Sequence, residues 1–179
     1  MENKYKLEIK SKRVEAEDYC RDYRDIPLFA QACKACDNYG KRYGCPPFEN
    51  NEYGLTEGWR YATVFVGIVR MVADDLPLET GLKLLREARI EMEHKLLGLE
   101  KEFKGMAFTF GGKCIHCSVP CARLEGKPCR NPELVRPSLE SLGFDLGRTL
   151  SDIFGIEMKW GRRGRAPEYF TLVAAVFHN

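Results

Sequence analysis

The sequence has no long apolar run, and what it lacks excludes several classes of protein. No stretch approaches the roughly 18 consecutive apolar residues that a membrane span requires. The formal net charge is only +2, whereas a nucleic-acid-binding domain carries a basic stripe or a pI above about 9. The chain also has no Walker loop, no dinucleotide fingerprint and no Ser–His–Asp pattern. We therefore expect no membrane insertion and no nucleic-acid partner, while any small-molecule substrate stays open.

The chain is rich in cysteine, and the compartment in which it is expected bears on what these cysteines do. The first residues, Met1 to Lys6, lead into no apolar signal-peptide core, so we expect a cytoplasmic protein. Eight cysteines in a reducing compartment are more often metal ligands or redox groups than disulfides. Their spacing then decides which chemistry they serve.

The length of 179 residues, 44% of them hydrophobic, predicts one domain over residues 1–179. Apolar periodicity predicts strands and helices in alternation. The strands are expected at residues 5–9, 61–72, 106–110 and 169–177. The helices are expected at 15–24, from a start with Pro77 in the first turn to an end at Gly105, and from Pro137 onward with a break at Gly143. On the long helix, Leu78, Leu82, Leu85, Met92, Leu96, Leu99 and Phe103 form the apolar face, with Glu91/Lys95 and Glu100/Lys104 as outer ion pairs.

This order predicts an α/β or α+β fold, with helices packed on a small mixed sheet. Two cysteine-rich metal-binding loops interrupt it. The expected divisions are a first cysteine loop at residues 20–56, a core at 57–112 and 137–179, and a second cysteine loop at 113–136. Loops mounted beside strands are common places for functional sites.

The second cysteine group reads C-x2-C-x3-C-x7-C through Cys114, Cys117, Cys121 and Cys129. Four thiolates in one short loop surround a metal centre at little chain-closure cost. Three close cysteines plus one more are typical of cubane iron–sulfur clusters, whereas a structural zinc more often uses two separated C-x2-C pairs. The spacing thus favours iron and keeps zinc as the alternative. We expect His116, which lies between two of these cysteines, on the surface or beside the ligands.

The first cysteine group reads C-x2-C-x8-C-P-P through Cys33, Cys36 and Cys45. It offers three thiolates and leaves the fourth ligand open between Cys20, another group and an exogenous molecule. Cys20 fits a small buried side chain equally well. A metal centre with an open position is suited to chemistry rather than to structure, so this group is the candidate reactive site.

Basic residues accompany the first cysteine group. Lys34, Lys41 and Arg42 are expected to lower the pKa of the thiols and to offset the negative charge of a cluster, unless they form an ordinary solvated loop. A second basic run contains Arg162, Arg163 and Arg165. It could bind a phosphate or an acidic partner protein, although such runs are more often solvated.

These motifs together resemble a known family. The matching features are Cys33-x2-Cys36, Tyr39-Gly40, Cys45-Pro46-Pro47, the segment from Cys114 to Pro132, and Arg136-Pro137-Ser138 with Gly143. They are similar to a family of cysteine-rich predicted metal-binding proteins from anaerobic bacteria and archaea, catalogued as a domain of unknown function. The resemblance covers most of the chain and implies metal binding in a cytosolic, anaerobic setting. It supplies no reaction, and Cys20 lies outside its pattern.

The sequence therefore predicts a protein with two clusters of the [4Fe–4S] type and a redox partner protein, acting in electron transfer or as a redox enzyme or accessory protein. The predicted cofactor ligands are Cys33, Cys36, Cys45, Cys114, Cys117, Cys121 and Cys129. The rival hypotheses are a zinc-stapled interaction module without redox chemistry, and a metal-delivery protein with exchangeable thiolates.

Overall fold

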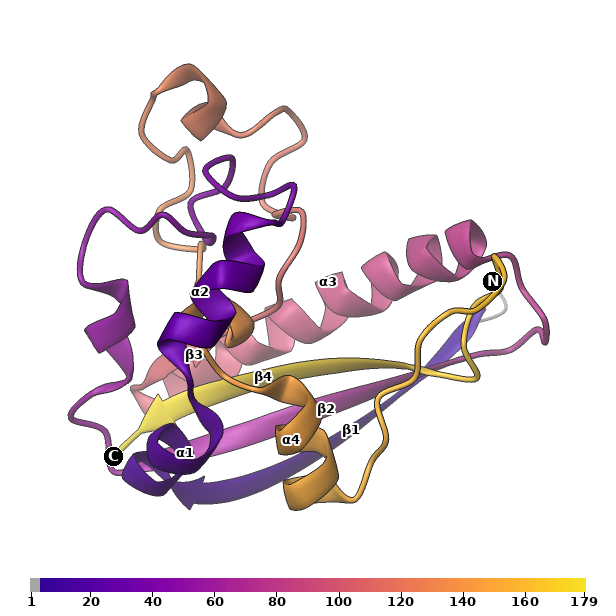
Figure 1. The fold of residues 1–179 in the computed structure, drawn as a ribbon, viewed down its shortest axis with the longest axis horizontal. Helices are drawn as coiled ribbons and strands as arrows, with labels where there is room; N and C mark the ends of the chain where they lie inside the picture. Colours follow the sequence, from indigo (N-terminus) through magenta and orange to yellow (C-terminus); the bar gives the residue numbers. More distant parts are fainter. Residues whose placement is uncertain (1–3) are drawn as a thin grey trace.

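The computed structural model describes residues 4–179 and contains a four-stranded sheet in the order β1-β2-β4-β3 (Figure 1). The strands are β1 (Tyr5–Glu15), β2 (Tyr61–Met71), β3 (Met106–Phe108) and β4 (Phe170–His178). All three pairings between these strands are antiparallel. The predicted α+β class is confirmed, and the sheet is antiparallel where a mixed one was expected.

β2, which fills most of the strand predicted at residues 61–72, is covered on both faces of the sheet. Val64 and Val66 belong to one buried cluster, and Phe65 and Val69 belong to the other. This follows from the two-residue period of a strand, which sends successive side chains to opposite faces. The sheet therefore separates two hydrophobic cores.

α3 (Leu78–Phe103) covers one face of the sheet along its length (Figure 1). Its buried side includes Leu84, Ala88, Met92 and Leu96, spaced by four residues as an α-helix requires. The ion pair between Glu91 and Lys95 forms as predicted. Leu82 was expected on the apolar face, but 48% of it is exposed.

The opposite face is covered by shorter elements. These are α1 (Ala16–Tyr23), the 3₁₀ turn η3 (Glu140–Leu142), and α4 (Leu146–Arg148), which continues as a π-helical turn over Thr149–Phe154. Gly143 separates η3 from α4 as predicted, since its φ of 97° is a left-handed conformation that glycine adopts without strain. The Asp145 side chain accepts a hydrogen bond from the Arg148 N–H and so caps α4.

The first cysteine loop is less irregular than predicted, because it contains a helix, α2 (Ile26–Lys34). Asp25 caps this helix through the Leu28 N–H, and Pro27 lies in its first turn. A further 3₁₀ turn, η1, spans Glu52–Thr56. Cys33 therefore lies on the last turn of α2 rather than in a loop.

The two cysteine loops lie side by side above one end of the sheet, near the C-terminal end of α3 (Figure 1). The second loop contains only the short 3₁₀ turn η2 (Ala122–Glu125) as regular structure. No helix among residues 4–179 is both long enough and apolar enough to cross a membrane.

Candidate metal centres

The first cysteine group is built at the C-terminal end of α2. Cys33 occupies the last turn, and the N–H of Cys36 donates to the Cys33 carbonyl across the helix end (3.0 Å). Gly40, at a φ of 70°, turns the chain back so that its N–H donates to the Pro46 carbonyl (2.8 Å). The turn returns Cys45 toward the other two cysteines, and all three thiols are close enough to act on one another electrostatically.

The pKa values of two of these thiols are raised, contrary to the prediction from the basic residues. Burial raises the pKa of Cys33, and the carboxylate of Glu140 adds to the effect. Burial raises the pKa of Cys45 to about 11, and the neighbouring thiols and Glu140 outweigh the opposing charge of Arg42. A metal therefore has to displace protons in order to bind here.

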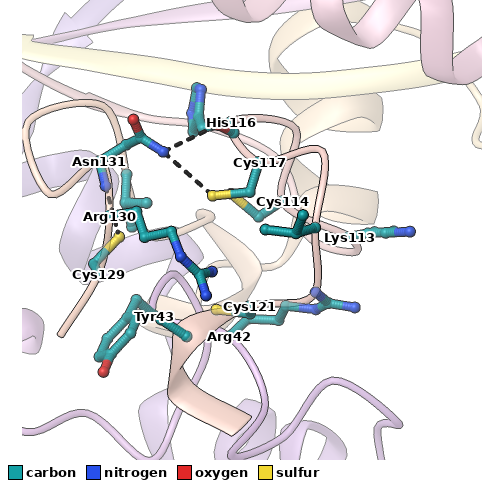
Figure 2. A pocket seen from close by; sticks show the side chains of 13 residues that line it. Arg42, Tyr43, Lys113, Cys114, His116, Cys117, Cys121, Cys129, Arg130 and Asn131 are labelled. Carbon is teal, nitrogen blue, oxygen red and sulfur yellow. Dashed lines mark hydrogen bonds between the residues drawn. The ribbon is translucent and has the colours of Figure 1, made fainter. Parts of the chain in front are cut away.

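The second cysteine group lines a single pocket. Figure 2 shows the thiols of Cys114, Cys117, Cys121 and Cys129 around this pocket, together with Arg42, Tyr43 and Arg130. Three of these cysteines come from the turns that precede η2, and Cys129 comes from the segment that follows it. The structure thus brings together the four residues that the spacing predicted as one ligand set.

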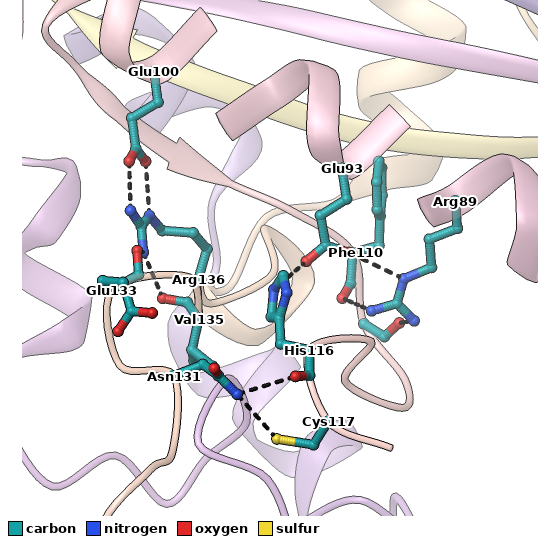
Figure 3. A network of polar contacts seen from close by, with 11 residues as sticks. Arg89, Glu93, Glu100, Phe110, His116, Cys117, Asn131, Glu133, Val135 and Arg136 are labelled. Carbon is teal, nitrogen blue, oxygen red and sulfur yellow. Dashed lines mark hydrogen bonds and ion pairs between the residues drawn. The ribbon is translucent and has the colours of Figure 1, made fainter. Parts of the chain in front are cut away.

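Asn131 donates hydrogen bonds to two sulfurs of the second group. Its side-chain amide donates to Cys117 Sγ (3.2 Å), as Figures 2 and 3 show. Its backbone N–H donates to Cys129 Sγ (3.4 Å) (Figure 2). The same amide donates to the His116 carbonyl (3.0 Å). Donors aimed at sulfur stabilise thiolate charge and tune a bound metal. Sequence reasoning missed Asn131, although its place two residues after Cys129 was a usable signal.

The thiols fit a metal centre in number and chemistry but not the geometry of one bound ion. Within residues 4–179, no group of three or more His, Cys, Asp or Glu side chains is arranged so that it could hold a metal ion. A tetrahedral zinc needs four sulfurs at about 2.3 Å from one point. A cubane needs its four sulfurs farther apart, because each binds a different iron corner. The four thiols that line the pocket supply the number of ligands that either arrangement needs.

His116 is buried against α3, so it is not the surface residue that was one of the two expectations. Its Nε2 lies 3.2 Å from Glu93 Oε1, and Glu93 is only 3% exposed (Figure 3). Arg89 Nε lies 3.6 Å from the other oxygen of Glu93. Arg89 also donates to the carbonyls of Phe110 and Gly111. A buried polar chain therefore runs from the second cysteine group to α3. Glu93, next to Met92 on the apolar side of the helix, was a signal that sequence reasoning passed over.

The two cysteine loops are tied together by side chains that no motif indicated. Arg123, in η2, donates to the carbonyls of Arg42 (2.6 Å), Cys45 (2.8 Å) and Pro47. In return, the Tyr43 hydroxyl donates to the Lys127 carbonyl. Cys45 and Cys114 line the wall of a second pocket. The two predicted centres are therefore neighbours across one interface between the loops.

The end of the second loop is anchored to α3 by an ion pair. Arg136 Nε donates to Glu100 Oε2 (2.7 Å), and the same oxygen accepts the Ala107 N–H (2.6 Å) (Figure 3). Glu100 was predicted to pair with Lys104, but Lys104 ends the helix at a φ of 51°. Burial disfavours the ionised Glu100 carboxylate, yet the hydrogen bonds from Arg136 and Ala107 outweigh it and lower the pKa of Glu100.

We expect Glu100→Gln to lower the free energy of unfolding by about 2 kcal/mol at pH 7, because charge-assisted hydrogen bonds contribute on that order. The lowered pKa sets the sign of the pH dependence. The stabilisation is fully present above the pKa of an unfolded glutamate, about 4.3, and is lost as pH falls through the lower folded value. Urea unfolding at pH 7 and at acid pH measures the difference between wild type and variant.

Glu102→Gln is the matched control, since Glu102 lies on the same helix and is exposed. It should change stability by no more than about 0.5 kcal/mol. A Glu100→Gln effect as small as that of the control, or one that grows toward acid pH, would contradict the described anchor.

Cys20 and the basic turn lie apart from these thiols. Cys20 is a residue of α1. It lines a pocket with Arg24 and Thr56 and packs against the hydrophobic core. Burial raises its pKa. Arg165 bonds to Asp75, just ahead of the N-terminal end of α3, whereas the cysteine loops lie near the C-terminal end (Figure 1). The structure therefore groups neither Cys20 nor the basic turn with the cysteine groups.

The family expected from the cysteine motifs is confirmed by comparison with known proteins. A family model described as "Predicted metal-binding protein (DUF2284)" matches residues 19–177. No match was found among curated proteins or among solved structures. The matched range contains both cysteine groups, Asn131, Arg123 and the Glu100–Arg136 pair. The chain belongs to the family of predicted metal-binding proteins DUF2284.

Proposed function

We propose that this chain is an iron–sulfur protein with two [4Fe–4S] clusters, which exchanges electrons with a partner protein as a carrier or as part of a redox enzyme in anaerobic metabolism. Cys114, Cys117, Cys121 and Cys129 would hold one cluster, and the first cysteine group would hold the other. The observation that carries the proposal is the pocket lined by all four thiols of the second group. A cluster bound there supplies a one-electron redox couple.

The spacing of the cysteines supports a cluster over a single ion. The C-x2-C-x3-C run with one further cysteine, all lining one pocket, suits a ligand with several metal corners, each bound by one sulfur. A structural zinc would be expected to draw its ligands toward one point.

The surrounding residues have roles that suit a redox centre. The N–H groups of Asn131 would stabilise negative charge on Cys117 and Cys129, and hydrogen bonds of this kind help to set a cluster's potential. Arg42 and Arg130 line the same pocket and would offset part of that charge. Cys36 is exposed, so the first group lies where a partner protein can approach.

The test is metal analysis of protein purified without oxygen, with iron, acid-labile sulfide and zinc measured on the same sample. We expect a brown protein with about eight irons and about eight sulfides per chain, twice the content of one cubane. Reduction by dithionite should bleach the visible absorption and produce an electron paramagnetic resonance signal. A colourless protein with one or two zinc ions per chain would refute the proposal and favour the interaction module.

A further inference from the structure

Glu140, the first residue of η3, has a buried carboxylate oxygen without a partner. Its Oε1 accepts the Gly111 N–H (2.9 Å). Its Oε2 is shielded from solvent and has no hydrogen-bond partner among residues 4–179. A buried, unpaired carboxylate oxygen is costly, and native structures seldom leave one without a purpose. Oε2 therefore needs a hydrogen-bonding or coordinating group, and residues 4–179 do not supply one.

This carboxylate lies within electrostatic reach of two thiols of the first cysteine group. The Glu140 charge acts on both Cys33 and Cys45 and contributes to the raised pKa of each. The fold explains this proximity, because α2, which carries Cys33 on its last turn, packs against η3. Arg89 is also near Glu140, but it directs its N–H groups to the carbonyls of Phe110 and Gly111. Glu140 thus lies within electrostatic reach of Cys33 and Cys45, on a turn that packs against the helix carrying Cys33.

We propose that Glu140 is the fourth ligand of the centre held by Cys33, Cys36 and Cys45, and that it binds through Oε2. This inference rests on the proposed function, since it assigns a ligand within one of its two centres. It also identifies the fourth ligand of this centre, which sequence reasoning left open. Cys20, the candidate weighed from the sequence, lines a separate pocket with Arg24 and Thr56. A carboxylate oxygen is an established ligand for iron and zinc in proteins.

The proposed donor set has a chemical consequence. Three thiolates and one carboxylate make one corner of the centre harder than the others, and carboxylate oxygen is a poorer match than thiolate for the iron of a cluster. That corner is the one from which a ligand is most readily displaced. The first centre would then have one labile corner, and the second centre, with four cysteines, would serve electron transfer.

The experiment isolates the first centre in a Cys117→Ser background, so that the second centre does not contribute. The protein is loaded with ⁵⁷Fe and sulfide under anaerobic conditions, and Mössbauer spectra are recorded for this parent and its variants. We expect about a quarter of the parent's iron signal to come from a distinct, oxygen-ligated site, since one of four irons is involved. Glu140→Cys should abolish the distinct site while iron content is kept, and Glu140→Gln should lower the content by about one iron per chain.

The control is Glu133→Gln, the same change at an exposed carboxylate of the second loop. It should leave the spectrum and iron content as in the parent, and circular dichroism checks that each variant is folded. If Glu140→Gln and Glu140→Cys both give the parent's spectrum, the inference is overturned while the proposed function stands.

Failure of the proposed function is recognised separately in the parent. If the parent contains zinc without iron or sulfide, the iron–sulfur proposal fails. Glu140 is then judged by zinc content, which Glu140→Gln must lower, and an unchanged content overturns the inference. A parent whose first cysteine group takes up neither metal overturns both.

Discussion

Cys117→Ser is expected to remove the second metal centre and to leave the first, so that anaerobically purified protein keeps about half of its iron and sulfide. Cys117 lines the pocket of the second group and accepts the Asn131 amide N–H. A serine hydroxyl is a poor cluster ligand beside thiolates, since iron–sulfur clusters are held by deprotonated cysteine. The measurement is iron and sulfide content together with the electron paramagnetic resonance spectrum of the reduced protein.

Cys20→Ser is the matched control, because it makes the same atomic change at a cysteine outside both groups. It should keep both centres. If Cys117→Ser removed both centres while the chain stayed folded, the seven cysteines would form one shared site. If Cys20→Ser removed the first centre, Cys20 would be a ligand and the structural placement of that residue would be wrong.

Phe144→Ala should lower the free energy of unfolding by about 3–5 kcal/mol, as truncations of buried aromatic residues do. Phe144 is fully buried between the sheet and the elements that cover it. Its ring stacks on Tyr19 with the centroids 4.8 Å apart and meets Phe177 at 6.2 Å. The Arg24 guanidinium lies 5.5 Å from its ring centroid. Since domains are stable by roughly 5–15 kcal/mol, this loss is a large share of the total stability. Urea unfolding of the wild type and the variant measures it.

Trp160→Ala is the control for losing an aromatic ring, because Trp160 is 73% exposed. It should change stability by about 0.5 kcal/mol or less. If Phe144→Ala were equally mild, the layer formed by α1 and η3 would not be packed against the sheet as described.

The helices and strands with a strong apolar periodicity were predictable from the sequence. Those that form because they pair with or pack on other segments were not. β2 and α3 carry their own signals, a continuous apolar run and a repeat of three and four residues. β1 was predicted only over residues 5–9, because its later residues are mostly exposed and do not alternate. It extends to Glu15 because it pairs with β2 along its whole length. α2 is apolar in sequence and capped by Asp25, but it was missed because the cysteine at its end was assigned to an irregular loop.

The candidate site divides in the same way. That Cys114, Cys117, Cys121 and Cys129 gather at one pocket was predictable, because the cysteines lie at short, characteristic spacings in the sequence. Glu140, Glu93 and Arg123 were not, since each acts on cysteines far away in the sequence and ordinary glutamates and arginines carry no motif. Arg42 lowers the pKa of Cys45 as expected, but the net pKa is raised, because the sequence shows charge and not burial, and burial has the larger effect.

The bonds from Arg123 to the carbonyls of Arg42, Cys45 and Pro47 have a consequence for assembly. If each loop binds a metal centre as proposed, ordering one loop would hold the other closer to its binding shape, and the second loading would cost less conformational entropy than the first. Thermodynamic linkage would make this gain in affinity the same whichever loop fills first. At limiting metal, half-loaded chains would therefore be fewer than independent binding predicts.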